Sequence, residues 1–324
     1  MKKSFAIILM LSLVIGMFAF VGCDKSDKKA CDIGLSVSTQ NNPFFVTLVE
    51  GAEKAAKDAG VEITVVDAGD DATKQVSDIE DLVSKGVKVL IVNPVDSDAV
   101  SGAVQSAIDE GVKVIAVDRV VNDVDVDCTI ASDNVLGAEL ATQYLVEELG
   151  KKAKVAELVG TSGASAAIDR SEGFHNIADK KLKVVASQTA DFDRTKGMEV
   201  MENILQKNGK IKGVFAANDE MALGAVEAID GAKKKIMVVG FDATDDAIEA
   251  IKKGKMAATI AQQPDLIGAT GVENAIKLIN GEKIDKKIPV EVKLVTKKSL
   301  SGDDDAKEEK EDKEDKEDKV DKED

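Results

Sequence analysis

The sequence predicts an α/β fold made of two doubly wound parallel-sheet lobes. Short valine-rich runs alternate with amphipathic stretches of helical length, which is typical of buried parallel strands and their crossover helices. The same order of polar residues also occurs twice. A run ending in Asn93 is followed 25 residues later by one ending in Asp118, and Asn218 is followed 24 residues later by Asp242. The chain therefore reads as two copies of one sheet domain.

Each expected strand is an apolar run of four to seven residues, and each expected helix is a longer amphipathic stretch. We expect buried parallel strands at residues 33–37, 63–67, 89–93, 114–118, 155–160, 184–188, 214–218, 237–241 and 258–262. We expect helices at residues 44–59, 72–85, 97–110, 134–149, 194–207 and 265–280. Glycines mark the places where helices should end, namely Gly60, Gly86, Gly111, Gly150, Gly209 and Gly281.

The chain begins with an expected export signal. Lys2 and Lys3 precede an apolar run, which stops at Gly22-Cys23 and gives way to polar sequence. This pattern resembles a bacterial lipoprotein signal, which implies a signal peptide at residues 1–22, a lipid on Cys23 and a linker at 23–31. A single membrane-spanning anchor is the alternative, although the run is short for a span. Both readings place the body outside the cytoplasmic membrane, in the periplasm or on the membrane's outer face.

The other end is strongly acidic. Residues 301–324 hold 14 Asp/Glu and 6 Lys with almost no apolar residues, so we predict a disordered, solvated tail. Of the formal net charge of −17, the tail contributes −8 and the signal +2, which leaves −11 on residues 23–300. An acidic body argues against a nucleic-acid partner and suits a monomer.

The few cysteines and the single histidine limit which disulfides and metal sites are possible. An exported protein is permitted a disulfide, and Cys31 and Cys128 remain once Cys23 is explained. We expect two free, mostly buried thiols because these positions should lie far apart, with a Cys31–Cys128 bridge as the alternative. With one histidine in the chain and no paired cysteines, we expect no metal site. No cofactor motif is present either.

Polar and aromatic side chains gather where strands end, which is where open α/β sheets bind ligands. Amides donate and accept hydrogen bonds, carboxylates accept them and guanidinium groups donate several. Aromatic rings stack on the apolar faces of sugar rings. Such a set fits a small ligand rich in hydroxyl groups. The candidates are Ser38, Asn42, Phe44, Phe45, Asn93, Asp118, Arg119, Arg170, Phe192, Asn218, Phe241, Asp242 and Gln262.

Several motifs together resemble the periplasmic ribose-binding proteins of sugar ABC transporters. They are STQNNPFF, VNPVDSDAV, VDR, IASDNVLGAELA, GASAAIDRSEGF, SQTADFDRTKG, FAANDEMALGA, VVGFD and ATIAQQPDLIGA, and the likeness runs from about Asp32 to Lys298. The resemblance implies that eleven of the candidates contact ribose while Ser38 and Phe241 line the pocket. Ile168 replaces a residue that is often Arg in the family.

The resemblance also implies how the lobes are divided. One lobe would hold residues 32–132 plus 263–292 and the other residues 133–262 plus 293–300. They would be joined by a three-segment hinge at Ser132, Asp133, Gln262, Gln263 and Lys293. The implied function is capture of D-ribose between the lobes and delivery to a membrane permease, with a chemoreceptor as a second partner in some members of the family.

Two other classes of function compete with this one. Asp118 and Asp242 together suggest the carboxylate pair of a glycoside-acting enzyme, but we expect Arg119 to keep Asp118 ionised and therefore useless as an acid. A sugar-responsive repressor shares the two-lobe body, but it would need an N-terminal DNA-binding segment and no export signal. The more serious alternative is a binding protein for a different monosaccharide or a furanose-like signal.

Overall fold

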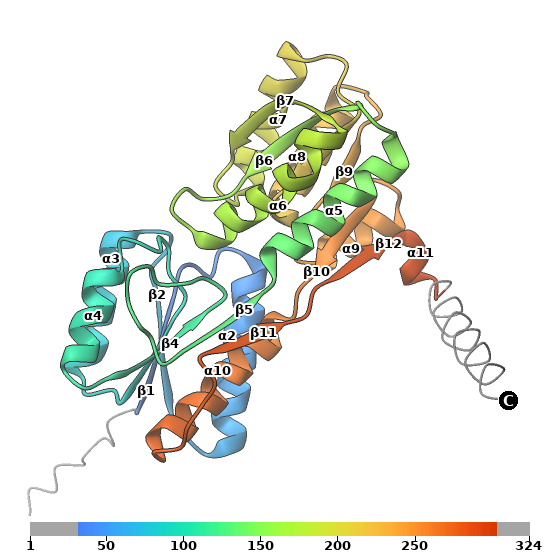
Figure 1. Ribbon diagram of the computed structural model, residues 1–324. Coiled ribbons are helices and arrows are strands. Elements are labelled where there is room, and N and C mark those ends of the chain that lie inside the picture. The colour runs from blue at the N-terminus through green and yellow to red at the C-terminus, as the bar shows by residue number, and fades with distance from the viewer. Residues whose placement is uncertain (1–31, 303–324) are drawn as a thin grey trace, which may run out of the picture. The chain divides into compact units, whose positions relative to one another are not determined.

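The computed structural model describes residues 32–302, and these residues form two lobes, each built on a six-stranded sheet (Figure 1). The predicted signal, Cys23, the linker, Cys31 and the acidic tail beyond Gly302 lie outside the described residues. Within the described part, no helix is both long enough and apolar enough to cross a membrane. The predicted α/β class with two doubly wound lobes is confirmed.

The first sheet is wholly parallel. Its strands are β1 (Ile33–Val37), β2 (Ile63–Asp67), β3 (Val89–Val92), β4 (Lys113–Val117), β5 (Cys128–Ser132) and β11 (Lys287–Val290), in the order β11-β5-β4-β3-β1-β2. Its helices are α2 (Pro43–Ala59), α3 (Ala72–Ser84), α4 (Ser101–Asp109) and α10 (Pro264–Ile279). Successive strand residues point to opposite faces. Ile91 therefore packs with α2 and α10, while Leu90 packs with α3 and α4.

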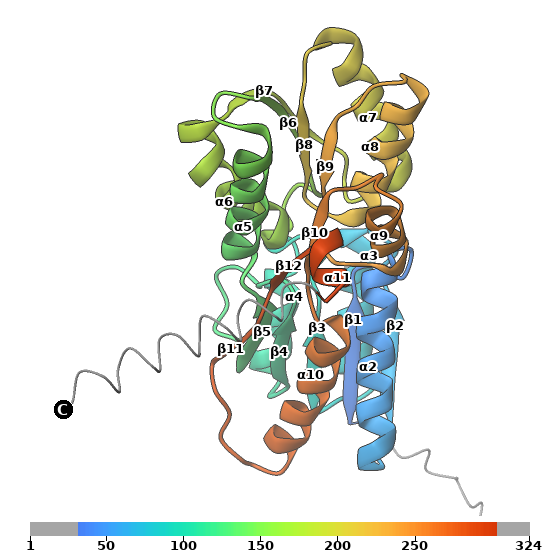
Figure 2. The ribbon, with the colours of Figure 1, turned by 90° about the vertical axis from the view of Figure 1, so that its right-hand side faces the viewer.

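The second sheet repeats this plan with one reversed edge strand. Its strands are β6 (Lys154–Val159), β7 (Lys183–Thr189), β8 (Gly213–Ala216), β9 (Met237–Val239), β10 (Ala258–Ala261) and β12 (Lys293–Thr296), in the order β12-β10-β9-β8-β6-β7. Only β12 runs antiparallel to its neighbour. Its helices are α5 (Asn134–Leu149), α6 (Ser165–Lys181), α7 (Arg194–Lys207), α8 (Asp219–Gly231), α9 (Asp245–Lys252) and α11 (Lys297–Leu300). Figure 2 shows α5 and α6 on one side of the sheet and α7 and α8 on the other.

The chain passes between the two sheets in three places. Ser132 ends β5, and Asp133 caps α5 by accepting a hydrogen bond from the Leu136 amide. Gln262 and Gln263 connect β10 to α10, and the third passage joins β11 to β12, which begins at Lys293. The Gln263 side chain donates to the carbonyl of Glu291, 3.3 Å away, so two of the passages touch each other.

Two expectations about the elements were wrong. The helix expected from residue 97 begins at Ser101, because residues 97–100 form a turn in which the Ser97 amide and carbonyl bond Gly163 and Asn122. The runs at residues 63–67 and 184–188 were expected to be buried, but they form the edge strands β2 and β7. β2 is only partly buried and β7 is largely exposed. The structure also contains α6, α8 and α9, which were not among the helices expected from the amphipathic pattern.

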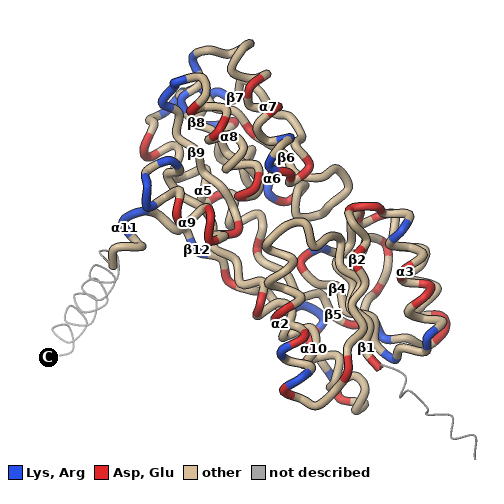
Figure 3. Tube along the Cα trace, turned by 180° about the vertical axis from the view of Figure 1, so that it is seen from behind, with Lys and Arg blue, Asp and Glu red and all other residues tan. Residues whose placement is uncertain are grey.

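Lysines gather at the end of the second lobe where its strands begin. Lys210 and Lys212 precede β8, and Lys233, Lys234 and Lys235 precede β9 (blue in Figure 3). Parallel strands begin at the edge of the sheet opposite to the one where they end, so these cations lie away from the strand ends that bind ligands.

Candidate functional site

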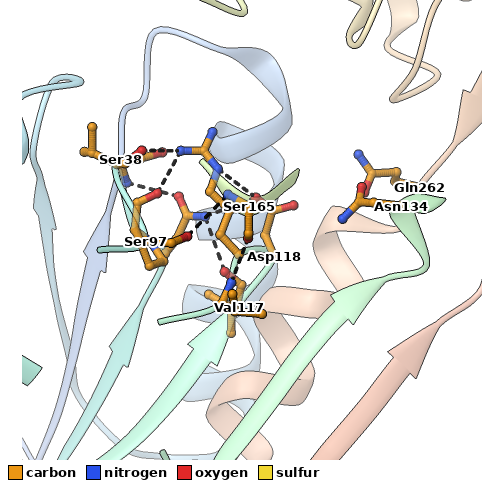
Figure 4. Close-up of polar contacts among 12 residues, drawn as sticks. Ser38, Ser97, Val117, Asp118, Asn134, Ser165 and Gln262 are labelled. Atoms are coloured by element: carbon orange, nitrogen blue, oxygen red, sulfur yellow. Dashed lines mark hydrogen bonds and ion pairs between the residues drawn. The ribbon is translucent and has the colours of Figure 1, made fainter. Parts of the chain in front are cut away.

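Three polar residues at the ends of β1, β3 and β4 are bonded to one another. The Asn93 side chain accepts a hydrogen bond from the Ser38 amide at 3.1 Å and donates to the Asp118 carboxylate at 3.1 Å. It also donates to the carbonyl of Val117. Figure 4 shows Ser38, Val117 and Asp118 close together at these strand ends. Asn93 therefore fixes the position of the Asp118 carboxylate.

Arg119 follows Asp118 directly and is almost fully buried. Its guanidinium donates to the carbonyl of Pro94 at 2.7 Å, and its Nε lies 3.6 Å from the Asp118 carboxylate. The same group lies over the rings of Phe45, from the first lobe, and Phe192, from the second. A cation between two aromatic faces is held in one orientation by both.

The aromatic side chains of the first lobe are positioned by a helix start. Asn42 caps α2 by accepting a hydrogen bond from the Phe44 amide at 2.9 Å, and Pro43 occupies the first helical position. Proline is favoured at that position because its ring fixes a helical φ. The cap therefore fixes Phe44 and Phe45, whose rings meet edge to face 5.1 Å apart.

Arg170 is the corresponding cation of the second lobe. It lies on α6, almost fully buried, and donates to the Asn134 side chain at 2.8 Å and to the carbonyl of Ala217 at 2.7 Å. Its guanidinium stacks over Phe241 at 3.9 Å and lies 3.6 Å from the Asp242 carboxylate. Within residues 32–302, Arg119 and Arg170 are the buried cationic side chains.

Phe192 sits on a loop with an unusual backbone. Asp191 and Phe192 both have positive φ angles, of 53° and 60°, which non-glycine residues rarely adopt. The Asn218 side chain supports the loop by donating to the carbonyl of Phe192. The ring passes so close to Gly160 that a Cβ at that position would overlap it. Gly160 is thus required for the ring's position.

Asp242 and Gln262 complete the second lobe's contribution. The Gln262 side chain donates to the Asp242 carboxylate at 2.7 Å, and both residues are buried. In Figure 4, Gln262 lies beside Asn134 and apart from the cluster at Ser38 and Asp118. Asp242 therefore has Gln262 on one side and Arg170 on another.

These side chains enclose a pocket between the lobes, and nine of the thirteen predicted residues line it. The lining residues are Asn42, Phe44, Phe45, Asp118, Arg119, Ala166, Arg170, Phe192, Asn218 and Asp242. Ala166 was not predicted, because a small apolar residue gives no chemical signal. Ser38, Asn93, Phe241 and Gln262 are predicted residues that do not line it, and Asn93 and Phe241 instead support Asp118 and Arg170.

The pocket is nearly filled by its own side chains. Its free volume is about 10 Å³, roughly the space that one water molecule needs. The lobes also touch directly beside it. The Ser97 amide donates to the carbonyl of Gly163 at 2.9 Å, and the Val120 amide donates to the Ser165 hydroxyl at 3.0 Å. This arrangement is therefore a closed one, and a ligand larger than water requires the walls to separate.

Burial changes the pKa of two carboxyl groups that line the pocket. Burial raises the pKa of Asp118, and the nearby Arg119 and Arg170 oppose that rise without reversing it. Arg119 favours the ionised form of Asp118, but burial has the larger effect on this pKa, and the expectation that Arg119 keeps Asp118 ionised stays a prediction. Burial also raises the pKa of Asp242 well above its usual range, with Arg170 again opposing.

Several buried polar atoms of the site have no hydrogen-bond partner. They include the Asp118 Oδ1, the Arg119 Nε and the Gln262 Oε1. Burying a polar group without a partner is costly, so such atoms in a native protein need an explanation. The Asp118 acceptor and the Arg119 donor line the pocket, so a ligand that both donates and accepts would satisfy them.

A larger groove of about 590 Å³ lies on the second lobe alone, beside α6 and β7. Its walls include the exposed Ile168 and His175, and no residue of the first lobe contributes to it. His175 bonds the Glu157 and Asp179 carboxylates, as expected for a structural histidine. The groove is bigger than the pocket between the lobes, but it contains none of the buried guanidinium groups that converge there.

No metal centre accompanies the pocket. Among residues 32–302, no three His, Cys, Asp or Glu side chains are grouped as a metal ion would need. Cys128 is buried with a free thiol, and burial raises the pKa of that thiol to about 11. Its relation to Cys31 stays a prediction, because Cys31 lies outside the described residues.

Comparison with known proteins agrees with the two-lobed site. Residues 33–283 match the periplasmic binding protein domain. The chain is 50% identical to the "Ribose import binding protein RbsB" of Bacillus subtilis, over 92% of this chain and 100% of that protein. It is also 50% identical to the protein of the same name from Escherichia coli K12, over 82% of this chain and 90% of that protein.

Solved structures show the same architecture at lower identity. A Caulobacter myo-inositol binding protein bound to myo-inositol is 32% identical with a TM-score of 0.81, over 85% of this chain and 96% of that one. The chain therefore belongs to the periplasmic binding protein family. This membership makes it a solute-binding protein and not an enzyme, so the glycoside-acting alternative is set aside.

Proposed function

We propose that this protein binds D-ribose in the pocket between its lobes and delivers it to an ABC permease. The observation that carries the proposal is the pair of buried pocket atoms without a hydrogen-bond partner, the Asp118 Oδ1 and the Arg119 Nε. Each hydroxyl of a sugar can donate and accept, so a pentose can satisfy acceptors and donors together. Ribose is also the ligand in the names of the relatives at about 50% identity.

The aromatic side chains suit the same ligand. Phe44 and Phe45 come from the first lobe and Phe192 from the second, and all three line the pocket. Rings on two sides can cover the apolar faces of a sugar while the polar groups bind its edge. The roles of the thirteen predicted residues as ligand contacts or supports belong to this proposal.

A different monosaccharide is the main alternative. More distant relatives are named for D-apiose at 38% identity and for rhizopine at 32%, so the fold accepts several polyols. The individual contacts decide between them, because fold alone does not fix the ligand.

A thermal-shift panel of pentoses and hexoses tests the proposal. D-ribose should raise the melting temperature far more than D-glucose or D-galactose, because an extra hydroxymethyl group would clash or leave polar groups unpaired. D-apiose and myo-inositol are informative controls. An equal or larger shift with any of these sugars would reject ribose as the preferred ligand.

We also propose that a lipid on Cys23 holds the protein at the outer face of the cytoplasmic membrane, as a monomer. The support is the apolar run that ends at Gly22-Cys23, far in sequence from every proposed contact. Several acyl chains on one residue anchor a protein stably, where one chain is marginal. At this location the permease, and also a chemoreceptor, would recognise the closed form.

Cys23→Ser should release the protein from the membrane without weakening ribose binding. The reason is that the acyl chains need the cysteine sulfur, while the pocket is built from residues after Ser38. Membrane fractionation of cells that express each form provides the measurement. A Ser variant that stays with the membrane after washing without detergent would show that something other than the lipid is the anchor.

A further inference from the structure

The chain that carries Asp242 has a strained backbone. Asp242 has a φ of 125° and Ala243 one of 57°, two consecutive values that side-chain-bearing residues rarely adopt. Such conformations persist only where surrounding interactions hold them, and they concentrate at functional sites. The turn directs the Asp242 carboxylate toward Arg170 and Gln262. Neighbouring groups must therefore stabilise the backbone of this turn.

The holding group is Asp219, a fully buried carboxylate on the first turn of α8. Its Oδ2 accepts hydrogen bonds from the Thr244 amide at 2.8 Å and from the Thr244 hydroxyl at 3.3 Å. Its Oδ1 accepts from the Thr259 hydroxyl at 2.7 Å, and that hydroxyl accepts from the Ala243 amide at 3.2 Å. The two amides that follow Asp242 are thus both tied to Asp219, one directly and one through Thr259.

The residues packed around the Asp219 carboxylate leave no space for a larger group. A Cβ on Gly240 would overlap the Asp219 Oδ1, so only glycine fits there. Asn218, the residue before Asp219, lines the pocket and caps α8 by accepting from the Met221 amide. Asp219 itself does not line the pocket, so it has no direct part in the ligand contacts proposed above.

We propose that Asp219 is a positioning residue for sugar binding, which fixes the turn at Asp242–Thr244 so that the Asp242 carboxylate faces the ligand. This inference rests on the proposed function for its effect on affinity. The hydrogen-bond network itself does not depend on which sugar binds. Because three donors converge on the two carboxylate oxygens, the ionised form of Asp219 is the one that fits the network.

The protonation of Asp219 gives the inference a pH signature. Burial raises its pKa to about 7, while bonds from Thr259 and Thr244 lower it and Glu220 raises it. Asp242 and Arg170 also face this region and influence one another's charge. Ionised Asp219 predominates above pH 7, so ribose affinity should fall as the pH drops below 7 and the carboxylate takes up a proton.

Two substitutions separate the parts of the network. Asp219→Asn places an amide donor where an acceptor is needed, and it should weaken ribose binding by roughly tenfold or more. Removing this charge should also lower the pKa of Asp242, because Asp219 raises it. The acid-side loss of affinity should then begin at lower pH than in the wild type. Thr259→Val removes the link to the Ala243 amide and also a bond that lowers the pKa of Asp219. It should therefore weaken binding and make the acid-side loss of affinity begin at higher pH than in the wild type.

The matched control is Asp245→Asn, at the exposed first residue of α9 directly after the turn, which should leave affinity and its pH profile unchanged. Calorimetry from pH 5.5 to 8.5 measures ribose affinity. Amide hydrogen exchange of Ala243 and Thr244 in the ligand-free protein tests the network separately, and it should quicken in both variants. A wild type that binds no ribose would refute the proposed function, while the exchange rates would still decide whether Asp219 holds the turn.

Affinity within twofold of the wild type in folded Asp219→Asn, with unchanged exchange at Ala243 and Thr244, would overturn the inference. If Asp219→Asn does not fold, Thr259→Val decides it. Affinity within twofold of the wild type in that variant would overturn the inference in the same way.

Discussion

Replacing Arg170 with alanine should weaken D-ribose binding by roughly 2–4 kcal/mol, the range for truncating one partner of a buried, charged hydrogen-bond network. The guanidinium lines the pocket and lies 3.6 Å from the Asp242 carboxylate. Its removal would leave Asp242 without its nearest cation, in a site where burial already raises the pKa of that carboxyl. Both the lost contact and the unpaired carboxylate therefore reduce affinity.

Arg194→Ala is the matched control for Arg170→Ala. Arg194 lies at the start of α7, about one third exposed, and bonds Glu220 and Asp246 rather than any residue of the pocket lining. Since neither Arg194 nor its two partners line the pocket, ribose affinity should change little. Calorimetry on both variants makes the comparison. Equal losses for the two arginines would contradict the assignment of Arg170 to the site.

Ribose should also shift the protein from an open to a closed arrangement of its lobes. Ser97 and Gly163 touch across the lobes beside the pocket, so this structure is a closed form. Its pocket has about 10 Å³ of free space, so a pentose can enter only when the lobes separate, and the form closed around ribose must have a wider pocket than this one. Periplasmic binding proteins as a class are a known example of hinge closure around a ligand. In this chain, the three passages at Ser132, Gln262 and Lys293 are where the bending would occur.

The size of the shift follows from the ligand's preference for the closed form. Moving a cleft from 1% to 99% closed requires ribose to favour the closed form by roughly 5.5 kcal/mol. Neither lobe alone satisfies the sugar, because Asp118 and Arg119 come from the first lobe and Arg170 and Asp242 from the second. Solution scattering should show a smaller radius of gyration with ribose. An unchanged radius with ribose bound would exclude closure as the signal for the permease.

The strand-end pattern predicted much of the fold and of the pocket, for a physical reason. Parallel strands end at one edge of a sheet, so polar residues such as Asp118 and Asp242 that follow them must gather there. Arg170 and Phe192 were candidates for their chemistry, as a donor of several hydrogen bonds and an aromatic ring in a loop. They lie on α6 and on the loop before α7 rather than directly at strand ends.

The sequence could not show which of the predicted residues line the pocket and which lie buried behind them. Asn93 and Asp118 both follow strands, but only the coordinates reveal that Asn93 lies behind Asp118 and outside the pocket lining. Asp219 reads in sequence as an ordinary acidic residue in a helix's first turn. Its role depends on Thr259, forty residues away, and on the space left by Gly240. Such contacts depend on tertiary packing, which has no local signature in the sequence.

A crystal structure of the protein grown with D-ribose tests the central claim most directly. We predict one sugar between the lobes, with hydroxyls bonded to the Asp118 Oδ1 and the Arg119 Nε, which have no hydrogen-bond partner without it. The rings of Phe44, Phe45 and Phe192 should cover its faces. A sugar bound in the groove beside His175, or held by one lobe alone, would contradict the account.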